Sequence, residues 1–284
     1  MSIRTFLKRF TAARYLDREI RLLQYVLGKP DCRLLPPAYC HCCSEFTWRY
    51  WSDKYEQTLR TLVPKWHLGT DYVDYMIKRE NVFCANCKSV SRMRLHAKTI
   101  LRLFKFRNVN QFVKFLETNP SFIIYEAARY HIFRHEKIKS LKNYIVSEYY
   151  PSRTFGGEIK GVLNEDLQKL SFKNETFDLI ITSEVLEHVA HLSRALNEIR
   201  RVLKPSGYHV FTIPIDYSLP KTQTRAVLLK NGRIKHILPP AIHGDDISSG
   251  SLAFRDFGLD THKLLEHHGF EVQDKNSVFI TQKE

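Results

Sequence analysis

The chain has 284 residues, of which 43% are hydrophobic and 26% are charged, and its formal net charge is +14. This length suffices for one large globular domain or two modest ones, and the absence of low-complexity tracts and fixed-period repeats excludes a repeat protein. No apolar stretch approaches a membrane span and no signal peptide is evident, so we expect no transmembrane segment and a cytoplasmic location.

The positive charge is concentrated in the first part of the chain. Residues 1–120 hold 22 Lys and Arg against 10 Asp and Glu, whereas residues 121–284 hold 22 against 20. A basic module of this kind could face phosphate-rich partners, a membrane surface or nucleic acid. The alternative is a solvated surface whose charge is partly offset by metal-bound thiolates. Nucleic acid is therefore a possible partner but not the favoured one.

The chain begins with a basic segment of helical periodicity. Residues 3–27 are predicted to form an amphipathic helix that packs on the rest of the protein or on a partner, with a membrane-surface role as the alternative. The predicted buried stripe consists of Phe6, Phe10, Leu16, Ile20, Leu23 and Leu27.

All six cysteines lie before residue 90. Two CxxC pairs, Cys40 with Cys43 and Cys84 with Cys87, have the spacing that lets two thiolates on one tight turn face a tetrahedral metal. In a cytoplasmic protein this pattern favours structural zinc over disulfides. Cys42 could replace Cys43 as a ligand, His41 is a weaker substitute, and Cys32 is expected to be a non-ligand.

Two further segments follow from the cysteine pattern. The 40 residues between the pairs are an insertion, Ser44 to Phe83, whose aromatic side chains indicate that it packs against the protein. A basic helix is predicted from Ser91 to about Lys105. Its Arg92 and Arg94 either contact the substrate or anchor the zinc module to the rest of the chain, and we favour anchoring.

An alternation of strands and helices begins after residue 120. Residues 121–125 form a predicted strand that ends at Glu126, and a helix is expected from about Ala128 to Leu141. A second strand, 144–147, ends at Glu148, and a glycine-containing loop leads to a third strand near 161–163. Ligands of such sheets collect at the carboxyl ends of the strands, which places the two glutamates at one edge.

Residues 177–214 are the most informative block of the chain. Residues 177–181 form an apolar run typical of a strand that is buried on both faces, and residues 191–203 carry apolar side chains at helical spacing. Lys204-Pro205-Ser206-Gly207 ends the helix, and a strand follows from Tyr208 to Ile213. A helix near 259–268 and a hairpin of 270–272 with 277–281 are predicted to close the fold.

The block FDLIITSEVLEHV with RVLKPSG resembles class I S-adenosylmethionine-dependent methyltransferases, in which FDxI, a short E-H-V segment and RVLKPGG recur in this order. The resemblance implies an α/β fold: a Rossmann-like seven-stranded methyltransferase sheet with an N-terminal helical, zinc-ribbon-like module. We expect this module in residues 1–120 and the methyltransferase domain in residues 121–284. The cofactors implied are S-adenosylmethionine and structural zinc.

The same resemblance implies which residues bind the cofactor. Glu148 would hydrogen-bond the ribose hydroxyls, the segment Asp166-Leu167 would hold the adenine, and Glu126 would lie near the methionine ammonium group. Ala127 stands in the loop where the family usually has glycine. The remaining predicted cofactor-binding residues lie at the end of the strand that starts at Phe177 and are Ser183 and Glu184.

The first loop departs from the family pattern. The sequence Glu126-Ala127-Ala128-Arg129 replaces the usual acid and Gly-x-Gly, and the left-handed conformations that glycine allows are costly for alanine. Either the cofactor binds with Glu126 still near its ammonium group, or the fold is a non-catalytic scaffold with Arg129 in the methionine pocket.

Two histidines are the candidate catalytic residues. His188, in the Glu187-His188 pair, and His243, in the segment His243-Gly244-Asp245-Asp246, could act as a base if the acceptor is a hydroxyl. Each could instead order its own loop. The excursion from Ile215 to Gly250, where the acceptor pocket is expected, also holds three cations that could meet an anionic acceptor or be solvated: Arg225, Lys230 and Arg233.

These features together predict an S-adenosylmethionine-dependent methyltransferase that acts on a small-molecule or glycan acceptor. The alternatives are a non-catalytic scaffold and a nucleic-acid-binding or nucleic-acid-modifying protein that docks through its basic zinc module. The sequence identifies neither the acceptor nor the oligomeric state.

Overall fold

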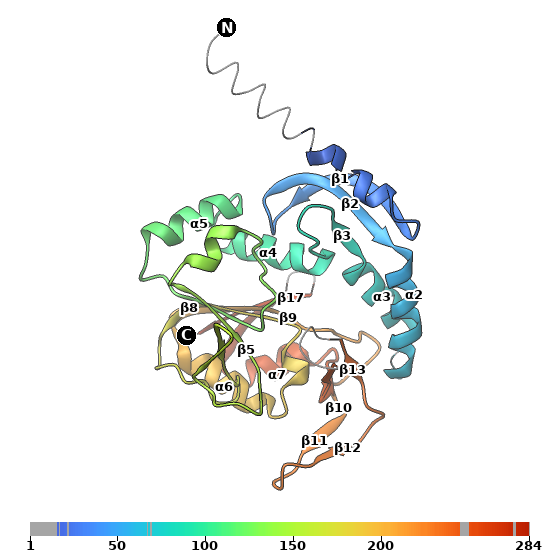
Figure 1. The fold of residues 1–284 in the computed structure, drawn as a ribbon. Coiled ribbons are helices and arrows are strands. Elements are labelled where there is room, and N and C mark those ends of the chain that lie inside the picture. The colour runs from blue at the N-terminus through green and yellow to red at the C-terminus, as the bar shows by residue number, and fades with distance from the viewer. Residues whose placement is uncertain are drawn as a thin grey trace.

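A computed structural model describes residues 16, 18–21, 23–66, 68, 70–244, 250–274 and 277–283 (Figure 1). Its central element is an eight-stranded sheet in the order β16-β17-β9-β8-β4-β5-β7-β6. The strands are β4 (Ile124–Ala127), β5 (Tyr144–Glu148), β6 (Glu158–Ile159), β7 (Val162–Asn164), β8 (Phe177–Ser183), β9 (Leu203–Thr212), β16 (Phe270–Asp274) and β17 (Val278–Lys283).

The middle of the sheet is parallel and both of its edges are antiparallel. β4 pairs in parallel with β5 and β8, β5 pairs in parallel with β7, and β8 pairs in parallel with β9. The closing hairpin β16–β17 is antiparallel and joins the sheet through β9. The expected seven strands are therefore confirmed, and β6 adds a two-residue edge strand that pairs antiparallel with β7.

One face of the sheet is covered by α6 (Leu192–Val202) and α7 (Thr261–Glu266). The predicted apolar stripe of α6 is fully buried, including Leu196 and Ile199, and it shares a core with Ile180 and Phe211 of the sheet. At the end of α6 the chain turns sharply, and Ser206, which stands where the family has glycine, has a φ of +60°.

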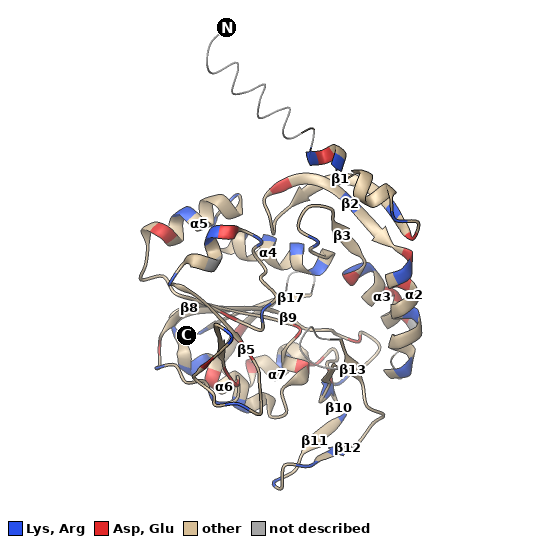
Figure 2. Cartoon of the chain, viewed as in Figure 1, with Lys and Arg blue, Asp and Glu red and all other residues tan. Residues whose placement is uncertain are grey.

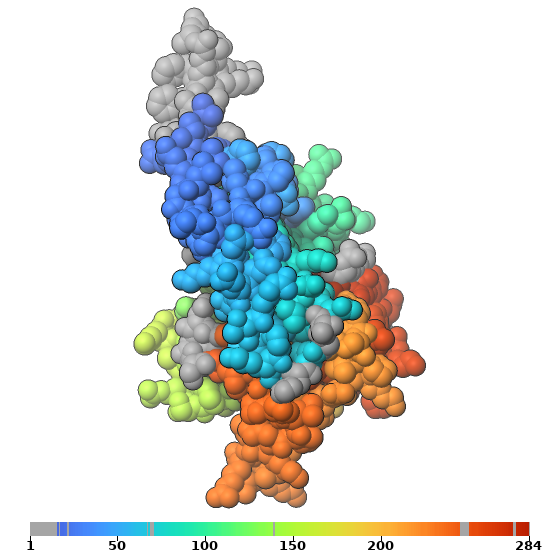
Figure 3. Space-filling view, turned by 90° about the vertical axis from the view of Figure 1, so that its right-hand side faces the viewer, coloured from blue at the N-terminus to red at the C-terminus, as the bar shows by residue number. Residues whose placement is uncertain are grey.

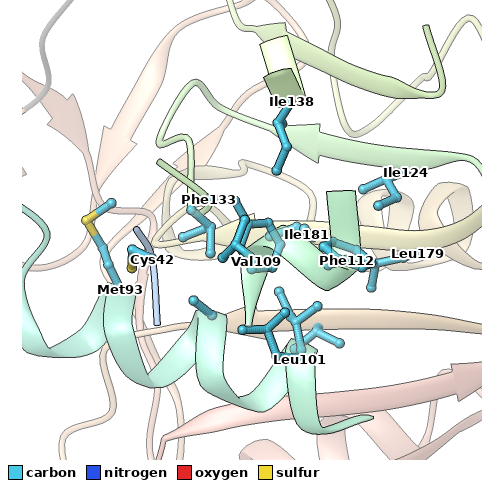
Figure 4. Packing of buried hydrophobic residues seen from close by; sticks show 14 of the residues in the cluster. Cys42, Met93, Leu101, Val109, Phe112, Ile124, Phe133, Ile138, Leu179 and Ile181 are labelled. Carbon is cyan, nitrogen blue, oxygen red and sulfur yellow. The ribbon is translucent and has the colours of Figure 1, made fainter. Parts of the chain in front are cut away.

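The other face is covered by two helices from the first part of the chain, α4 (Ser91–Leu103) and α5 (Val109–Thr118). Figure 4 shows Leu101, Val109 and Phe112 of these helices packed with Leu179 and Ile181 of β8. This core crosses residue 120, so the N-terminal module and the sheet share one apolar interior.

The helix expected over Ala128–Leu141 is wrong. The segment forms a loop and a short 3-10 helix, η2 (Glu136–Ser140), and Ala128 and His131 both have positive φ. Its apolar side chains instead pack on the two helices that already cover this face, as Phe133 does on Phe112, with ring centroids 5.1 Å apart. Because α4 and α5 occupy the face, no further helix is needed there.

The N-terminal module is a three-stranded antiparallel sheet with a helical insertion. Its strands are β1 (Cys32–Cys40), β2 (Glu45–Ser52) and β3 (Val82–Cys84), paired in that order. Between β2 and β3 lie α2 (Asp53–Leu62), the 3-10 helix η1 (Val63–Trp66) and α3 (Thr70–Glu80).

The insertion packs as predicted, and its partner is the excursion that follows β9. The excursion and the residues just after it form three antiparallel pairs: β10 (Gln223–Thr224) with β15 (Arg255–Asp256), β11 (Ala226–Leu228) with β12 (Ile234–His236), and β13 (Ile242–His243) with β14 (Ser251–Leu252). Trp66 and Met76 share an apolar cluster with Ala241 and Ala253. In Figure 3 the blue-to-cyan insertion rests directly on this orange segment.

The predicted helix over 3–27 is described only from residue 16 onward, and its first part, with Phe6 and Phe10, lies outside the described residues. The described positions from 16 to 27 are helical, but the predicted buried stripe is wrong. Leu16, Ile20 and Leu27 are 61%, 45% and 66% exposed, whereas Val26 is buried against the N-terminal module. Within the described ranges, no helix is long and apolar enough to cross a bilayer.

Candidate cofactor edge, metal cluster and histidine pair

Four cysteines from two turns converge at one point. The Sγ atoms of Cys40, Cys43, Cys84 and Cys87 all lie within 4.8 Å of one another. The Cys40–Cys87 and Cys43–Cys84 sulfur distances are 3.7 and 4.0 Å. Tetrahedral zinc with bonds of about 2.3 Å places sulfurs roughly 3.8 Å apart, so the cluster has the size that zinc requires.

The two turns have the same backbone construction. The amide of Ser44 donates to the carbonyl of Cys40 at 2.8 Å, and the amide of Lys88 donates to that of Cys84 at 2.9 Å. Ser44 and Lys88 both have positive φ, of 58° and 62°. This geometry points both thiols of each CxxC pair to one side, which is the predicted arrangement for a shared metal.

Of the alternative fourth ligands, Cys43 is the one that lies in the cluster. Cys42 is fully buried and packs in the apolar core beside Met93 (Figure 4). His41 stacks edge-on against Tyr39, with ring centroids 5.0 Å apart, and lies outside the cluster, as does Cys32.

A buried ionic network ties the N-terminal module to the carboxyl edge of the large sheet. Arg79 of α3 forms a bidentate ion pair with Glu184, and both N–O distances are 2.6 Å. Arg92 of α4 donates to Glu80 at 2.7 Å and to the hydroxyl of Ser183. Arg92 is thus an anchor, as favoured from the sequence. Arg94 bonds carbonyls within its own module.

This network gives the predicted cofactor residues Ser183 and Glu184 partners inside the protein. Burial opposes the charge of Glu184, but Arg79 and Arg92 outweigh it and lower the pKa of this carboxyl to about 2. Glu184 also has a φ of +54°. A cofactor contact of Ser183 or Glu184 stays a prediction. No sequence signal pointed to Arg79, because nothing distinguishes it from other helical cations.

Glu148 lies at the predicted edge, next to the end of β4. Its carboxylate accepts from the amide of Arg129 at 3.2 Å and from that of Tyr149 at 3.0 Å. Ala128 takes the left-handed conformation with a φ of +65°, so the chain makes here the turn for which the family uses glycine. The side chain of Arg129 is exposed and does not fill a buried pocket.

The adenine segment adjoins Glu148. The amide of Glu165 donates to the carbonyl of Glu148 at 3.0 Å, which places Asp166 one residue from the paired backbone. Asp166 accepts from the amide of Gln168 at 2.8 Å, and Leu167 is buried. The two predicted cofactor elements are therefore neighbours, as the methyltransferase interpretation requires.

Glu126 points into the protein. Its side chain accepts from the amide of Ile132 at 2.9 Å and from the hydroxyl of Tyr144 at 2.6 Å, and the residue is 1% exposed. One carboxylate oxygen thus supports the loop that follows β4, and the other bonds the first residue of β5. Ala127, which follows Glu126 and is predicted to approach the cofactor, is 4% exposed and is the last residue of β4. Contacts of either residue with the cofactor stay predictions.

Glu126 should make stability depend on pH. Burial raises the pKa of Glu126 to about 7 from its ordinary value of 4.5. The folded state holds this proton more tightly than the unfolded chain, so the stabilisation is complete below pH 4.5 and is lost as the pH rises through 7. The loss is at most about 3 kcal/mol.

We therefore expect Glu126→Gln to flatten this decline when urea unfolding is measured between about pH 5 and pH 8. The exposed Glu175→Gln variant serves as the control and should keep the wild-type profile. An unchanged pH profile in Glu126→Gln would rule out this carboxyl as the titrating group.

The two candidate catalytic histidines meet although 54 residues separate them. The rings of His188 and His243 make an edge-on contact with centroids 4.8 Å apart. Trp66 of the insertion packs against His243 with ring centroids 4.4 Å apart and the ring planes tilted by 38°. Burial and the neighbouring His188 lower the pKa of His243 to about 3, so this imidazole is neutral at physiological pH. Asp245 and Asp246 of the same segment lie outside the described residues.

The cations of the excursion have different roles from those expected. Arg225 is buried and donates to Asp256 at 2.7 Å and to the carbonyl of Trp66, so it ties the excursion to the insertion. It is thus neither a solvated cation nor available to an anionic acceptor. Lys230 and Arg233 are exposed on the β11–β12 hairpin.

The fold and this edge define the class of protein. A mostly parallel sheet with an antiparallel C-terminal hairpin, and with Glu148, Asp166 and the Glu187-His188 pair at the carboxyl edge, is the class I methyltransferase architecture that the motifs predicted. Residues 145–211, from β5 to β9, match the family described as Methyltransferase domain. Over these residues the chain carries a methyltransferase domain.

Individual relatives are distant. An uncharacterised protein of Methanocaldococcus jannaschii is 34% identical over 111 residues, which is 39% of this chain and 38% of that protein. The chain thus aligns with about two fifths of the length of that curated relative.

Two solved structures are similar over somewhat more than half of the chain. One is an S-adenosylmethionine-dependent methyltransferase of Mesorhizobium loti. It is 16% identical, the match covers 57% of this chain and 90% of the other, and the TM-score is 0.34. The other, from Thermotoga maritima, is described as a possible histamine N-methyltransferase. It is 16% identical, the match covers 62% of this chain and 96% of the other, and the TM-score is 0.35.

Proposed function

We propose that this protein transfers a methyl group from S-adenosylmethionine to a hydroxyl group of a small or saccharide-like acceptor. The observation that carries the proposal is the meeting of His188 and His243 just beyond the carboxyl end of β8. Methyl transfer needs a base when the acceptor is a weak nucleophile such as a hydroxyl, and a neutral, half-buried imidazole of this pair can take that proton.

The residues at the edge fit the adenosyl end of the cofactor. Each oxygen of Glu148 accepts one backbone amide and has a second lone pair, so the carboxylate can still accept both ribose hydroxyls. Asp166 and Leu167 adjoin it, and the left-handed Ala128 keeps the loop close to the strand ends. When bound, S-adenosylmethionine supplies the activated methyl group, and the protein aligns the acceptor and excludes water.

The acceptor side is built by two distant parts of the chain. The excursion contributes His243, and the insertion contributes Trp66, whose ring packs against that of His243. Arg225 and the shared apolar cluster hold these parts together. The packing of the insertion on the excursion favours a small acceptor, because the polymeric backbone of a nucleic acid needs an open, basic groove.

The distribution of charge supports the same choice. Lys and Arg positions are dispersed along the helices of both halves and on the β11–β12 hairpin (Figure 2). Several of the basic residues in the first 120 positions are committed to internal ion pairs, among them Arg79 and Arg92. We therefore propose a small acceptor in preference to nucleic acid.

We also propose that the four-cysteine cluster holds a structural zinc ion. Four thiolates at tetrahedral spacing leave no open position for a substrate, so the ion would stabilise the module without taking part in catalysis. None of the six cysteines forms a disulfide, which agrees with the proposed cytoplasmic location.

The cofactor assignment is tested by titration calorimetry with S-adenosylmethionine and its demethylated product. Glu148→Gln is expected to weaken binding about tenfold or more, because hydrogen bonds to a charged acceptor contribute roughly 1.5–3 kcal/mol. The exposed Glu158→Gln variant on β6 is the matched control and should bind like the wild type. Absence of heat with both ligands for the folded wild-type protein would leave the non-catalytic scaffold as the better interpretation.

A further inference from the structure

The most unusual polar group in the described part of the chain is the carboxylate of Glu187. The residue is fully buried, and neither of its two carboxylate oxygens accepts a hydrogen bond from any described residue. A buried acceptor left in this state costs about 1–3 kcal/mol, and more if it is charged. Such a group in a native protein calls for a cation, a ligand or a proton.

The nearest ring nitrogens face this carboxylate. The Nε2 atom of His188 lies 3.7 Å from Oε1 of Glu187, and one ligand atom from each of Glu187, His188 and His243 falls within 4.8 Å of the others. The Nδ1 atom of His188 lies 3.0 Å from the carbonyl of Leu252, to which it donates its proton. The lone pair of a neutral His188 therefore sits on Nε2, on the side of Glu187.

This second-sphere bond is typical of histidines that bind metals. A ligating imidazole commonly donates its other N–H to a backbone carbonyl, which fixes the tautomer and the ring orientation. A lone pair and a carboxylate oxygen turned toward each other across 3.7 Å are favourable when a cation lies between them.

The fixed cations nearby do not fulfil this role. Arg79 is paired with Glu184 at 2.6 Å, and Arg92 is paired with Glu80 at 2.7 Å. The guanidinium of Arg255 donates to two backbone carbonyls, those of Leu186 and Ala190. Among the described residues, none of these side chains forms an ion pair with Glu187.

We propose that Glu187, His188 and His243 bind a divalent transition-metal ion, of the class of Mn²⁺, Co²⁺ or Zn²⁺, at a site separate from the four-cysteine cluster. Two imidazoles and one carboxylate form a three-ligand face that leaves coordination positions open. In a role that rests on the proposed function, the two histidines act through the ion and not as free bases: the ion binds the acceptor's hydroxyl oxygen at an open position and lowers the pKa of that hydroxyl, which then gives its proton to solvent.

The test uses the full-length protein with its cysteine cluster loaded with zinc, and Mn²⁺ as the probe. Mn²⁺ prefers nitrogen and oxygen ligands to thiolates, so it reports on the second site. We expect loss of the free Mn²⁺ electron paramagnetic resonance signal at one ion per chain. Glu187→Gln and His243→Gln should each weaken this binding at least tenfold.

The matched control is His262→Gln. His262 also faces a carboxylate, that of Asp274 at 3.9 Å, but it is not one of the three proposed ligands. It should bind Mn²⁺ like the wild type. Thermal unfolding guards against a misfolded variant: Mn²⁺ should raise the melting temperature of the wild type but not that of Glu187→Gln. Without added Mn²⁺ the variant should be at least as stable as the wild type, because the unpartnered charge is gone.

Absence of Mn²⁺ and Co²⁺ binding by the folded wild type, or binding that neither variant weakens, would overturn the site. No cofactor is present in these measurements, so they are independent of methyl transfer. Bound Mn²⁺ together with no affinity for S-adenosylmethionine would overturn the proposed function and leave the ion site standing.

Discussion

Replacement of Cys84 by serine is expected to remove zinc from the protein and to unfold the N-terminal module. Cys84 is fully buried at the end of β3, and its sulfur lies 4.0 Å from that of Cys43. Structural zinc sites in small domains contribute about 10 kcal/mol or more, and the loss of one thiolate from four removes most of this.

The consequence of the lost thiolate should extend beyond the module. Cys40 and Cys84 belong to the same apolar cluster as Ile100 of α4 and Ile181 of β8. Unfolding of the zinc turns would therefore loosen the helices that cover one face of the large sheet. We expect a lower urea midpoint for the whole protein as well as a zinc content near zero by mass spectrometry.

Cys42→Ala is the matched control, because it changes a cysteine that lies between the proposed ligands Cys40 and Cys43 in the sequence. Cys42 packs against apolar side chains outside the cluster, so this variant should keep one zinc ion per chain and lose only a little stability. Retention of zinc by Cys84→Ser, or its loss from Cys42→Ala, would contradict the proposed ligand set.

The second large effect is expected from Arg79→Met. This change leaves Glu184 buried opposite the more distant Arg92, whose Nε atom is 4.0 Å away. Removal of one partner of a buried ion pair typically costs about 3–5 kcal/mol, since the remaining charge is uncompensated. The urea midpoint at neutral pH should fall accordingly.

The pH dependence of stability can show that the loss in Arg79→Met comes from the unpaired charge of Glu184. The pKa of Glu184 is about 2 in the folded protein, below its ordinary value of 4.5, so its stabilisation is present above pH 4.5 and is lost as the pH falls toward 2. In Arg79→Met this acid-dependent loss should shrink. The double variant Arg79→Met with Glu184→Gln should recover part of the stability, because no charge is left unpaired.

An exposed ion pair supplies the comparison. Arg60 and Asp74 are paired at 3.0 Å, but their side chains are 51% and 60% exposed, so Arg60→Met should change stability little. Equal effects of Arg79→Met and Arg60→Met would show that the buried pair does not hold the two parts of the protein together.

Local sequence was sufficient wherever a short pattern has one physical solution. The apolar run of β8, the apolar stripe of α6 and the Pro-Ser-Gly stop each specify an element whose side chains can be buried in only one way. The CxxC spacing likewise predicted the thiol cluster, because two cysteines three residues apart on a tight turn must face the same side.

Prediction failed where distant segments compete for the same surface. The stretch Ala128–Leu141 has helical composition, yet α4 and α5 already cover the face of the sheet on which that helix would pack, and the segment forms a loop with η2. The buried face predicted for the helix near residue 20 was wrong for a similar reason: Leu16, Ile20 and Leu27 are exposed, and Val26 is buried. Periodicity shows that a helix is amphipathic and not which partner it meets.

The sequence alone thus determined the sheet, the thiol ligands and the carboxylates at the strand ends, because these depend on spacing within one segment or on the common direction of parallel strands. The tertiary structure alone decided the partners of charged side chains: Glu184 with Arg79, Arg225 with Trp66, and Glu187 with two histidines. These contacts join residues up to 159 positions apart, and their energies depend on burial, which local sequence does not specify.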